Sequence, residues 1–421
     1  MKIFLRESLK KLYEKYKHAF IVKNIVMLLK KRSYPIILGK EKKLVNQVLK
    51  SRNWNMSYGR KLIHHILEDE MENYFNVAGA VVVSSGGMAL QMTLRGLGLK
   101  HNDEVIHVVD TCVANSFSIL NSGLNPIFCD SNIETYLMDK HDVENQITEN
   151  TKAIMPIHLW GNIEDMDVVN MIAEKYQLKV VEDACLAFSG KFKDQYVGTL
   201  GDVGVFSFGS SKPIQAGEGG IIVSNDSTFI REMKAMRHWG DKTLDYGVRD
   251  HDILSWNGRT SEINCAVMLE QFRAYKKRFS EITNSVEIVK KCLDGIEGVE
   301  IVTGAKNAGN TPSYSQINLR INSELYTSKT LILKLLYNHG ISARDANFEL
   351  IPSINFFKSK RWQDWVISND LSRIESNYSR VYKNAQFIFD RCGIGIPIKY
   401  YNSEKKAKNL SMVLRRVFDV N

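Results

Sequence analysis

The feature that most constrains the fold is a series of short, β-rich apolar runs that alternate with helical patterns from about Tyr34 onward. The runs are Ala80–Ser84, Glu104–Val109, Pro126–Asp130, Ala153–His158, Lys179–Asp183, Val203–Phe208 and Gly220–Ser224. Runs that are apolar on both faces and separated by helices are typical of a parallel-rich sheet covered on both sides. The sequence therefore predicts an α/β protein with a mixed, mostly parallel sheet.

The chain is predicted to divide into three regions. Residues 34–280 form a large α/β domain, and residues 281–421, with longer helices, more aromatic residues and fewer β-rich runs, form a smaller C-terminal α/β domain. Residues 1–33 form a basic N-terminal extension with apolar residues at the three-and-four spacing of an amphipathic helix. Such a helix is typical of contact with an anionic membrane surface or a partner, or of packing on the protein body or a neighbouring subunit.

The net charge is concentrated in this extension. Residues 1–33 hold ten Lys or Arg against two Glu, so they carry +8 of the chain's +9. The near-neutral remainder removes the main electrostatic argument for nucleic-acid binding by the body. Positive charge recurs through the extension rather than preceding one apolar run, so no signal peptide is expected. No stretch reaches the roughly 20 apolar residues that span a bilayer. We therefore expect a cytoplasmic protein, with any membrane contact at the inner face through residues 1–33.

The cysteines predict neither a metal site nor a disulfide framework. Six cysteines are scattered along the chain with no C-x-x-C pair, which is typical of a reduced, cytoplasmic protein. No G-x-G-x-x-G follows the first run, so a dinucleotide-dependent dehydrogenase is not favoured either.

Four segments carry possible chemistry: Ser84–Leu90, Lys179–Ala184, Phe206–Gly220 and Trp256–Glu262. In the first, small residues where a strand runs into a helix leave backbone N–H groups free to bind an anion. In the second, Asp183 ends a strand at the sheet edge where ligands of doubly wound sheets collect. In the third, Lys212 lies in a Ser/Gly-rich loop, and Pro213 biases it away from helical geometry. Taken singly, these residues also fit a capped turn, a helix cap and an exposed loop lysine; the fourth segment fits a capped helix.

Their order and spacing together resemble the DegT/DnrJ/EryC1/StrS family of pyridoxal-phosphate-dependent sugar aminotransferases. The resemblance runs from about Gly39 to the C-terminus and includes Pro156–Gly161, Met236–Gly240 and Ile396–Ile398. It implies a fold-type-I transferase with pyridoxal 5'-phosphate as cofactor. It also implies an obligate homodimer with shared active sites. Residues 1–33 lie outside the family pattern.

The resemblance assigns a role to each site residue. Lys212 matches the Schiff-base lysine, whose amine must be partly neutral to attack an aldehyde. Asp183 matches the carboxylate that keeps the pyridine nitrogen protonated. Ser207 matches a phosphate-binding hydroxyl, and Gly87 and Met88 occupy the backbone positions of the phosphate cup. Asn257 matches a residue that reaches the phosphate from the neighbouring subunit. His158 and Arg259 lie in family-like segments, as supporting residues or as substrate contacts.

Three positions depart from the family pattern. Gly87 stands where a phosphate-contacting Thr is usual, Cys112 where a bulky residue covers the cofactor ring, and Leu186 where Gln or His approaches the ring hydroxyl. Each loss would weaken cofactor binding by about 1 kcal/mol.

The implied reaction transfers an amino group from glutamate or glutamine to a keto-sugar, with a nucleotide as the expected carrier, in surface-polysaccharide or amino-sugar biosynthesis. Two alternatives stay open. One is a non-catalytic or regulatory cofactor-binding paralogue, which the three departures suggest. The other is the sugar dehydratase branch of the family, in which His usually occupies the position of Lys212.

Overall fold

The computed structural model describes residues 37, 39–56, 62–242, 251–305, 309–326, 328–366, 368 and 370–418. From Lys40 onward the chain forms one compact unit. The amphipathic helix predicted within residues 1–33 lies outside the described residues. None of the helices that the structure describes is both long and apolar enough to cross a membrane.

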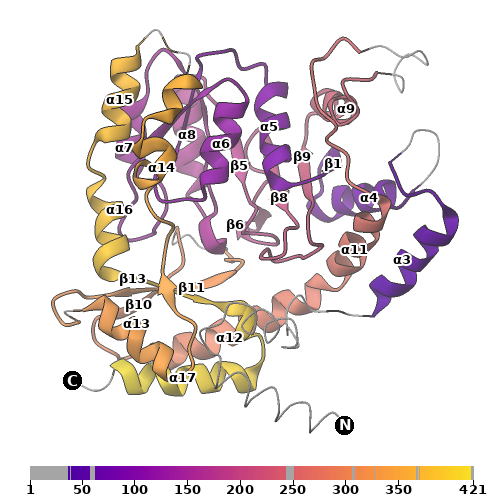
Figure 1. Ribbon diagram of the computed structural model, residues 1–421. Helices are drawn as coiled ribbons and strands as arrows, with labels where there is room; N and C mark the ends of the chain where they lie inside the picture. The colour runs from indigo at the N-terminus through magenta and orange to yellow at the C-terminus, as the bar shows by residue number, and fades with distance from the viewer. Residues whose placement is uncertain are drawn as a thin grey trace, which may run out of the picture. The chain divides into compact units, whose positions relative to one another are not determined.

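The large sheet contains every run that the sequence predicts as a strand (Figure 1). Its order is β1 (Gly79–Val83), β9 (Gly220–Ser224), β8 (Val203–Ser207), β5 (Lys179–Asp183), β4 (Thr151–Ile154), β2 (Glu104–Val108) and β3 (Asn125–Cys129). Strand β9 runs antiparallel to both neighbours and the other pairs are parallel. Strand β4 ends earlier than predicted, shortly before Pro156, which has no N–H to donate. The predicted mixed, mostly parallel sheet is confirmed.

Helices connect and cover these strands. They are α3 (Lys40–Ser51), α4 (Ile63–Phe75), α5 (Gly86–Gly96), α6 (Val113–Asn121), α7 (Lys140–Gln146), α8 (Met166–Tyr176), α9 (Ser227–Met236) and α11 (Glu262–Arg273). Helix α5 packs against β8 and β9, α8 against β4 and β5, and α4 and α9 against β1. Ser or Asp side chains cap five of these helices, because their oxygens accept otherwise unpaired backbone N–H groups.

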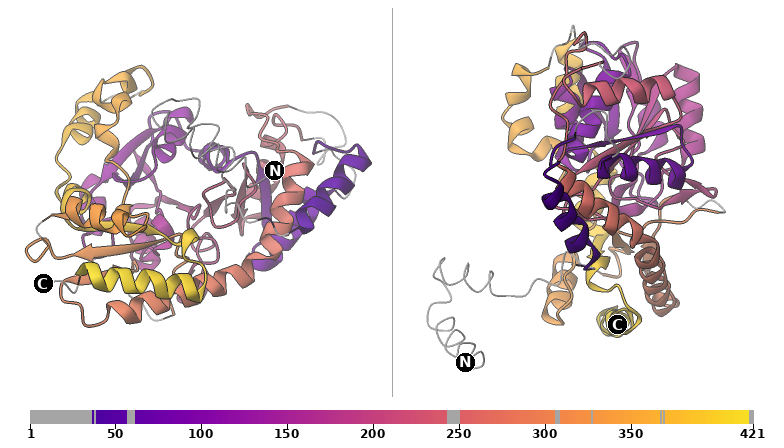
Figure 2. Two further views of the ribbon diagram at one scale, coloured as in Figure 1. Left: turned by 60° about the horizontal axis from the view of Figure 1, so that its bottom comes forward. Right: turned by 90° about the vertical axis from the view of Figure 1, so that its right-hand side faces the viewer.

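A second, smaller sheet is antiparallel and has the order β10 (Val299–Val302), β11 (Gln316–Ile321), β13 (Gly393–Pro397) and β12 (Arg344–Asp345). Helices α12 (Tyr275–Leu293), α13 (Lys329–Asn338) and α17 (Glu404–Phe418) accompany it, and α17 lies along α12 (Figure 2). This is the predicted smaller C-terminal α/β region. Helix α12 runs across residue 280, so the domain boundary placed there stays a prediction.

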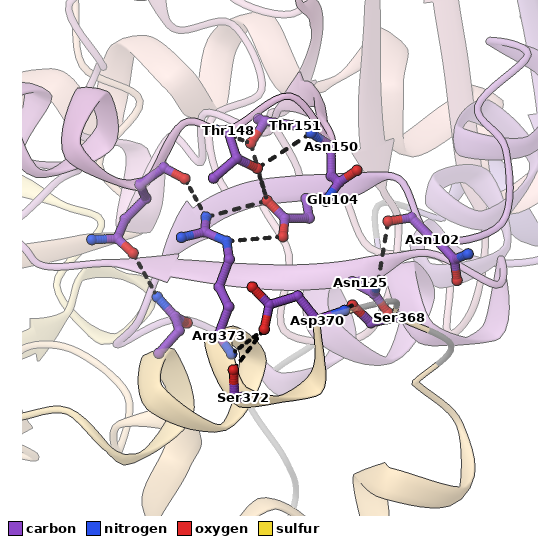
Figure 3. A network of polar contacts seen from close by, with 12 residues as sticks. Asn102, Glu104, Asn125, Thr148, Asn150, Thr151, Ser368, Asp370, Ser372 and Arg373 are labelled. Carbon is purple, nitrogen blue, oxygen red and sulfur yellow. Dashed lines mark hydrogen bonds and ion pairs between the residues drawn. The ribbon is translucent and has the colours of Figure 1, made fainter.

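Between β12 and β13 the chain returns to the large sheet. Helices α14 (Asn355–Lys358), α15 (Leu371–Ser379) and α16 (Lys383–Phe387) lie on this stretch. Arg373 of α15 binds the buried Glu104 carboxylate through Nε (3.1 Å) and Nη2 (3.2 Å), as Figure 3 shows. The Asn377 amide accepts from Phe128 N (2.9 Å) and donates to Phe128 O (3.0 Å). The two Asn377 bonds satisfy the backbone N–H and C=O of Phe128 on the open side of β3, the edge strand of the sheet.

Candidate active site

Asp183 ends strand β5 with a buried, oriented carboxylate. The amide Nδ2 of Asn115 in α6 donates to Asp183 Oδ2 at 2.6 Å, and the backbone N–H of Cys185 donates to Oδ1 at 3.0 Å. The backbone of Asp183 is held as well, since its N–H donates to Pro156 O at 2.9 Å. The carboxylate is therefore fixed at the carboxyl edge of the sheet, as the sequence predicts.

The start of helix α5 meets the end of strand β8. Ser85 caps the helix, and its Oγ accepts from Met88 N at 3.1 Å. A Cβ at Gly86 would lie 2.8 Å from Ser207 Cβ and 3.2 Å from Cys185 Sγ, so only glycine fits there. The first N–H groups of a helix have no acceptor within it, and the helix dipole favours an anion at this end. The Ser207 hydroxyl and the first turn of α5 thus share one anion-binding corner.

Gly87 differs from Gly86 in the space around it. The nearest atoms to a Cβ placed on Gly87 are Ser85 Oγ at 3.9 Å and Ser118 Oγ at 4.0 Å. These are ordinary van der Waals distances, so the fold leaves room for the threonine that the family pattern has here.

Lys212 lies on irregular backbone between β8 and β9, as Pro213 predicts. The Lys212 N–H donates to Gly209 O at 3.0 Å, and Gln215 Nε2 donates to Lys212 O at 3.1 Å. A Cβ at Gly209 would lie 3.6 Å from Ser207 Oγ and 3.7 Å from Lys212 Cγ. Ser207 Oγ and the stem of the Lys212 side chain therefore both flank Gly209.

The Cys185 thiol marks the place where these parts converge. Burial raises its pKa well above the usual value; the Asp183 carboxylate raises it further, Lys212 lowers it, and Cys112 raises it. The thiol also touches the position of the missing Cβ of Gly86. The Asp183 carboxylate and the start of α5 thus both lie against Cys185, and the charge of Lys212 acts on its thiol.

Asn257 is not joined to the other predicted site residues by its side chain. It is exposed, and its Oδ1 accepts from Arg259 N at 3.4 Å. The neighbouring Gly258 lies against helix α5, where a Cβ would be 2.9 Å from Met92 Sδ, and its carbonyl accepts from Ser84 N at 2.9 Å. The asparagine therefore projects from a loop anchored beside the anion-binding corner, with its side chain open to solvent in the single chain.

His158 has a supporting role, which the sequence left open. Its Nε2 pairs with the buried Glu182 Oε2 at 3.0 Å, and its Nδ1 accepts from Glu164 N at 3.2 Å. Glu182 in turn accepts from three backbone N–H groups of the turn at residues 198–201. Neither side chain has spare capacity for a substrate, so the pair serves to fix the strand that carries Asp183. Arg259 contacts His238, with Nη1 and Nδ1 3.2 Å apart.

Asn115 and Cys185 are contacts that the sequence does not single out. Ser85 has a local signal, because serine before a helix is a common cap. Asn115 has none, since it is separated from Asp183 by 68 residues and meets it only in the folded sheet.

Comparison with known proteins decides the family. The model of the DegT/DnrJ/EryC1/StrS aminotransferase family matches residues 35–375. The chain belongs to this family. The aminotransferase is 36% identical over 262 residues to a GDP-perosamine synthase of Escherichia coli O157:H7, covering 62% of this chain and 71% of that protein. It is 28% identical over 299 residues to a pleiotropic regulatory protein of Geobacillus stearothermophilus, covering 70% and 78% of the two chains.

Solved structures confirm the fold-type-I architecture. Helicobacter pylori PseC, an aminotransferase involved in the biosynthesis of pseudoaminic acid, matches with a TM-score of 0.79 and 22% identity over 92% of this chain and 98% of its own. The E. coli GDP-4-keto-6-deoxy-D-mannose-3-dehydratase with bound hydrated PLP matches with a TM-score of 0.74 and 22% identity over 90% and 99%. Aminotransferases of this family depend on pyridoxal 5'-phosphate, so the predicted enzyme class and cofactor are confirmed.

The residues present fit this cofactor. Its phosphate requires an anion-binding corner, which Ser207 and the start of α5 provide. Its ring nitrogen requires a carboxylate. Asp183 has this group, and the hydrogen bond from Asn115 holds it in orientation. Its aldehyde requires an amine, and Lys212 lies on the loop that leads away from this corner, with its stem beside Gly209.

Proposed function

We propose that this aminotransferase moves an amino group from glutamate or glutamine to a keto-sugar carried by a nucleotide, in surface-polysaccharide or amino-sugar biosynthesis. The observation that carries the proposal is that the Asp183 carboxylate and the start of α5 both lie against Cys185, with Lys212 on the loop that follows Ser207. The kinship to a GDP-perosamine synthase supports a nucleotide-linked sugar as acceptor.

In this proposal each residue acts on one part of the cofactor or of the amino donor. Ser207 and the backbone of Gly87 and Met88 anchor the phosphate, while Met88 N is also held by the Ser85 cap. Asp183 holds a proton on the ring nitrogen, and Asn115 keeps its carboxylate aimed. When bound, pyridoxal phosphate supplies an electron-accepting ring that stabilises the charge left by removal of the donor's α-proton. The amine of Lys212 takes that proton and returns it at the neighbouring carbon.

The test is a half-reaction without acceptor. The cofactor-loaded protein is mixed with glutamate and, separately, with glutamine, and its absorption band is followed. We expect the band to convert with one of the two donors and to return when a 4-keto or 3-keto nucleotide sugar is added. A band that no amino donor converts would contradict transamination.

The half-reaction tests the first alternative, and analysis of the sugar product tests the second. A protein whose bound cofactor never exchanges with donors would be a regulatory paralogue, which the kinship to a pleiotropic regulatory protein favours. A protein that removes a sugar hydroxyl rather than aminating the ketone would be a dehydratase, which shares the fold. Lys212 weighs against the dehydratase, because that branch usually has His at this position.

We also propose that the enzyme works as a homodimer with shared active sites. The exposed Asn257 side chain is available to the cofactor phosphate of the partner subunit.

From the sequence, we also propose that the protein is cytoplasmic and that residues 1–33 contact the inner face of the membrane. Flotation of the full-length and truncated proteins with anionic vesicles at low salt tests the membrane contact; equal partitioning would contradict it.

Gly87→Thr should tighten cofactor binding by about fivefold, equivalent to about 1 kcal/mol. A Cβ at this position would lie 3.9 Å from its nearest neighbour, so there is room for a side chain, and its hydroxyl is expected to contact the phosphate. Cofactor dissociation constants measured by absorption check this. Gly87→Ala is the matched control, because it changes helix propensity without adding a hydroxyl. Equal affinities in the Thr and Ala variants would show that no phosphate contact is gained.

A further inference from the structure

Arg344, on strand β12 of the smaller sheet, carries a positive charge that no described carboxylate balances. Its Nε donates to Gln316 Oε1 at 2.9 Å, and no described Asp or Glu lies within ion-pair distance of its guanidinium. The neighbouring Asp345 pairs with Lys329 instead. Partial burial lowers the pKa of Arg344, so an anion brought to its two terminal nitrogens would stabilise the charge.

The buried side-chain amide of Gln316 holds this guanidinium in place. Gln316 is fully buried, and its Nε2 donates to Ala346 O at 2.8 Å and to Asn318 Oδ1 at 2.6 Å. The amide lies over Gly395, where a Cβ would be 2.2 Å from Gln316 Nε2. These two bonds leave Gln316 Oε1 to accept from Arg344. The bond to Arg344 fixes one edge of the guanidinium, while the rest of the Arg344 side chain stays exposed.

The guanidinium lies over the indole of Trp160, with its carbon 4.5 Å from the ring centroid. Trp160 has a left-handed backbone (φ 59°), an unusual conformation for a bulky residue. Its Nε1–H is buried and has no hydrogen-bond partner among the described residues. Phe348 stacks on the same indole with centroids 4.9 Å apart. A strained residue with an unpaired donor indicates a functional constraint.

Arg344 and Trp160 lie next to the candidate active site, and hydrogen bonds from two neighbouring turns connect them to it. His158, two residues before Trp160, donates its backbone N–H to Asp183 O at 3.0 Å. On the other side, Phe348 N donates to Asp110 O at 3.3 Å, and Asp110 lies two residues before Cys112. Asp110 is itself held by Asn347 Nδ2 at 2.7 Å. Trp160 and Arg344 are thus placed beside the ends of β2 and β5, where Asp183 and Cys112 lie.

We propose that Arg344 is a specificity-determining residue that binds the anionic oxygens of a substrate, with the Trp160 indole packed beneath its guanidinium. This inference rests on the proposed function. Two groups of that reaction supply such oxygens: the carboxylate of the amino donor and the phosphate of the sugar's nucleotide carrier. A guanidinium with its two terminal nitrogens open matches either group in a bidentate pair.

The experiment measures binding without turnover, on the cofactor-loaded full-length protein. Calorimetry with glutarate probes the donor carboxylate, and calorimetry with guanosine and uridine diphosphates probes the carrier phosphate. We expect Arg344→Gln to weaken one of these ligands at least tenfold and Arg344→Lys to weaken it less. Arg320→Gln is the matched control, because Arg320 lies on β11 of the same sheet and pairs with Glu134 and Glu300. It should bind both ligands as the wild type does.

Weakened glutarate binding alone assigns Arg344 to the donor, and weakened diphosphate binding alone assigns it to the acceptor. If Arg344→Gln binds all ligands as tightly as the Arg320→Gln control, the inference is overturned. Trp160→Phe keeps an aromatic ring beneath the guanidinium but removes the indole N–H. It serves as a second variant if Arg344→Gln folds poorly. A protein that binds these ligands through Arg344 yet shows no donor half-reaction would refute the aminotransferase proposal while leaving the anion subsite standing.

Discussion

Replacing Lys212 with alanine is expected to lower kcat for amino transfer by about 10⁴-fold or more, the upper range for loss of a positioned proton-transfer group. The variant loses both the amine that joins the cofactor and the base that moves the donor's proton. Its stability should change little, because the side chain is only half-buried in a loop. Turnover with glutamate and the keto-sugar is the direct measurement.

Two further measurements make this prediction specific to the amine. Borohydride treatment of cofactor-saturated wild-type protein should label position 212, and mass spectrometry of the digest locates the label. Lys212→Arg keeps the positive charge but offers no neutral nucleophile, so it should be as inactive as the alanine variant. Lys179→Ala, which removes an exposed lysine paired with Asp202, is the control and should keep full activity. A label on another lysine would move the catalytic role away from Lys212.

The large sheet follows from the sequence because each strand is apolar on both faces, a pattern that local residues alone encode. Strands β5 and β9 have the predicted limits, Lys179–Asp183 and Gly220–Ser224. The limits of β4 were less well predicted, since an apolar run continues past the point where the chain leaves the sheet at Met155. The loop that carries Lys212 was predictable from Pro213.

The contacts that complete the site were not predictable in the same way. Asn115 orients Asp183, and Arg344 covers Trp160, only because β-strands and two sheets bring distant segments together. The role of His158 was undecided for the same reason, since its partners Glu182 and Glu164 belong to the surrounding fold. Residue type and spacing identified where the chemistry lies, whereas the tertiary fold determined which polar groups support it.

Asp183→Asn should lower kcat by about 10³-fold while leaving the cofactor bound, because the carboxylate acts on charge that develops during the reaction. The amide keeps the shape of the side chain, but it cannot hold a proton on the ring nitrogen. Its NH2 group cannot accept either of the hydrogen bonds that the two Asp183 oxygens now receive, from Asn115 Nδ2 at 2.6 Å and from Cys185 N at 3.0 Å. That mismatch costs about 1–3 kcal/mol of stability, so the melting temperature must be measured with the kinetics.

Two control variants separate charge from position. Asn115→Ala removes the 2.6 Å hydrogen bond to Asp183 but keeps the carboxylate, so its kcat should fall only about tenfold. Asp202→Asn alters a carboxylate that bonds Lys179 Nζ and the backbone N–H of Val180 at the other end of β5, and it should leave kcat unchanged. If Asp183→Asn loses no more activity than Asn115→Ala, the carboxylate only shapes the site, and another group must keep the ring nitrogen protonated.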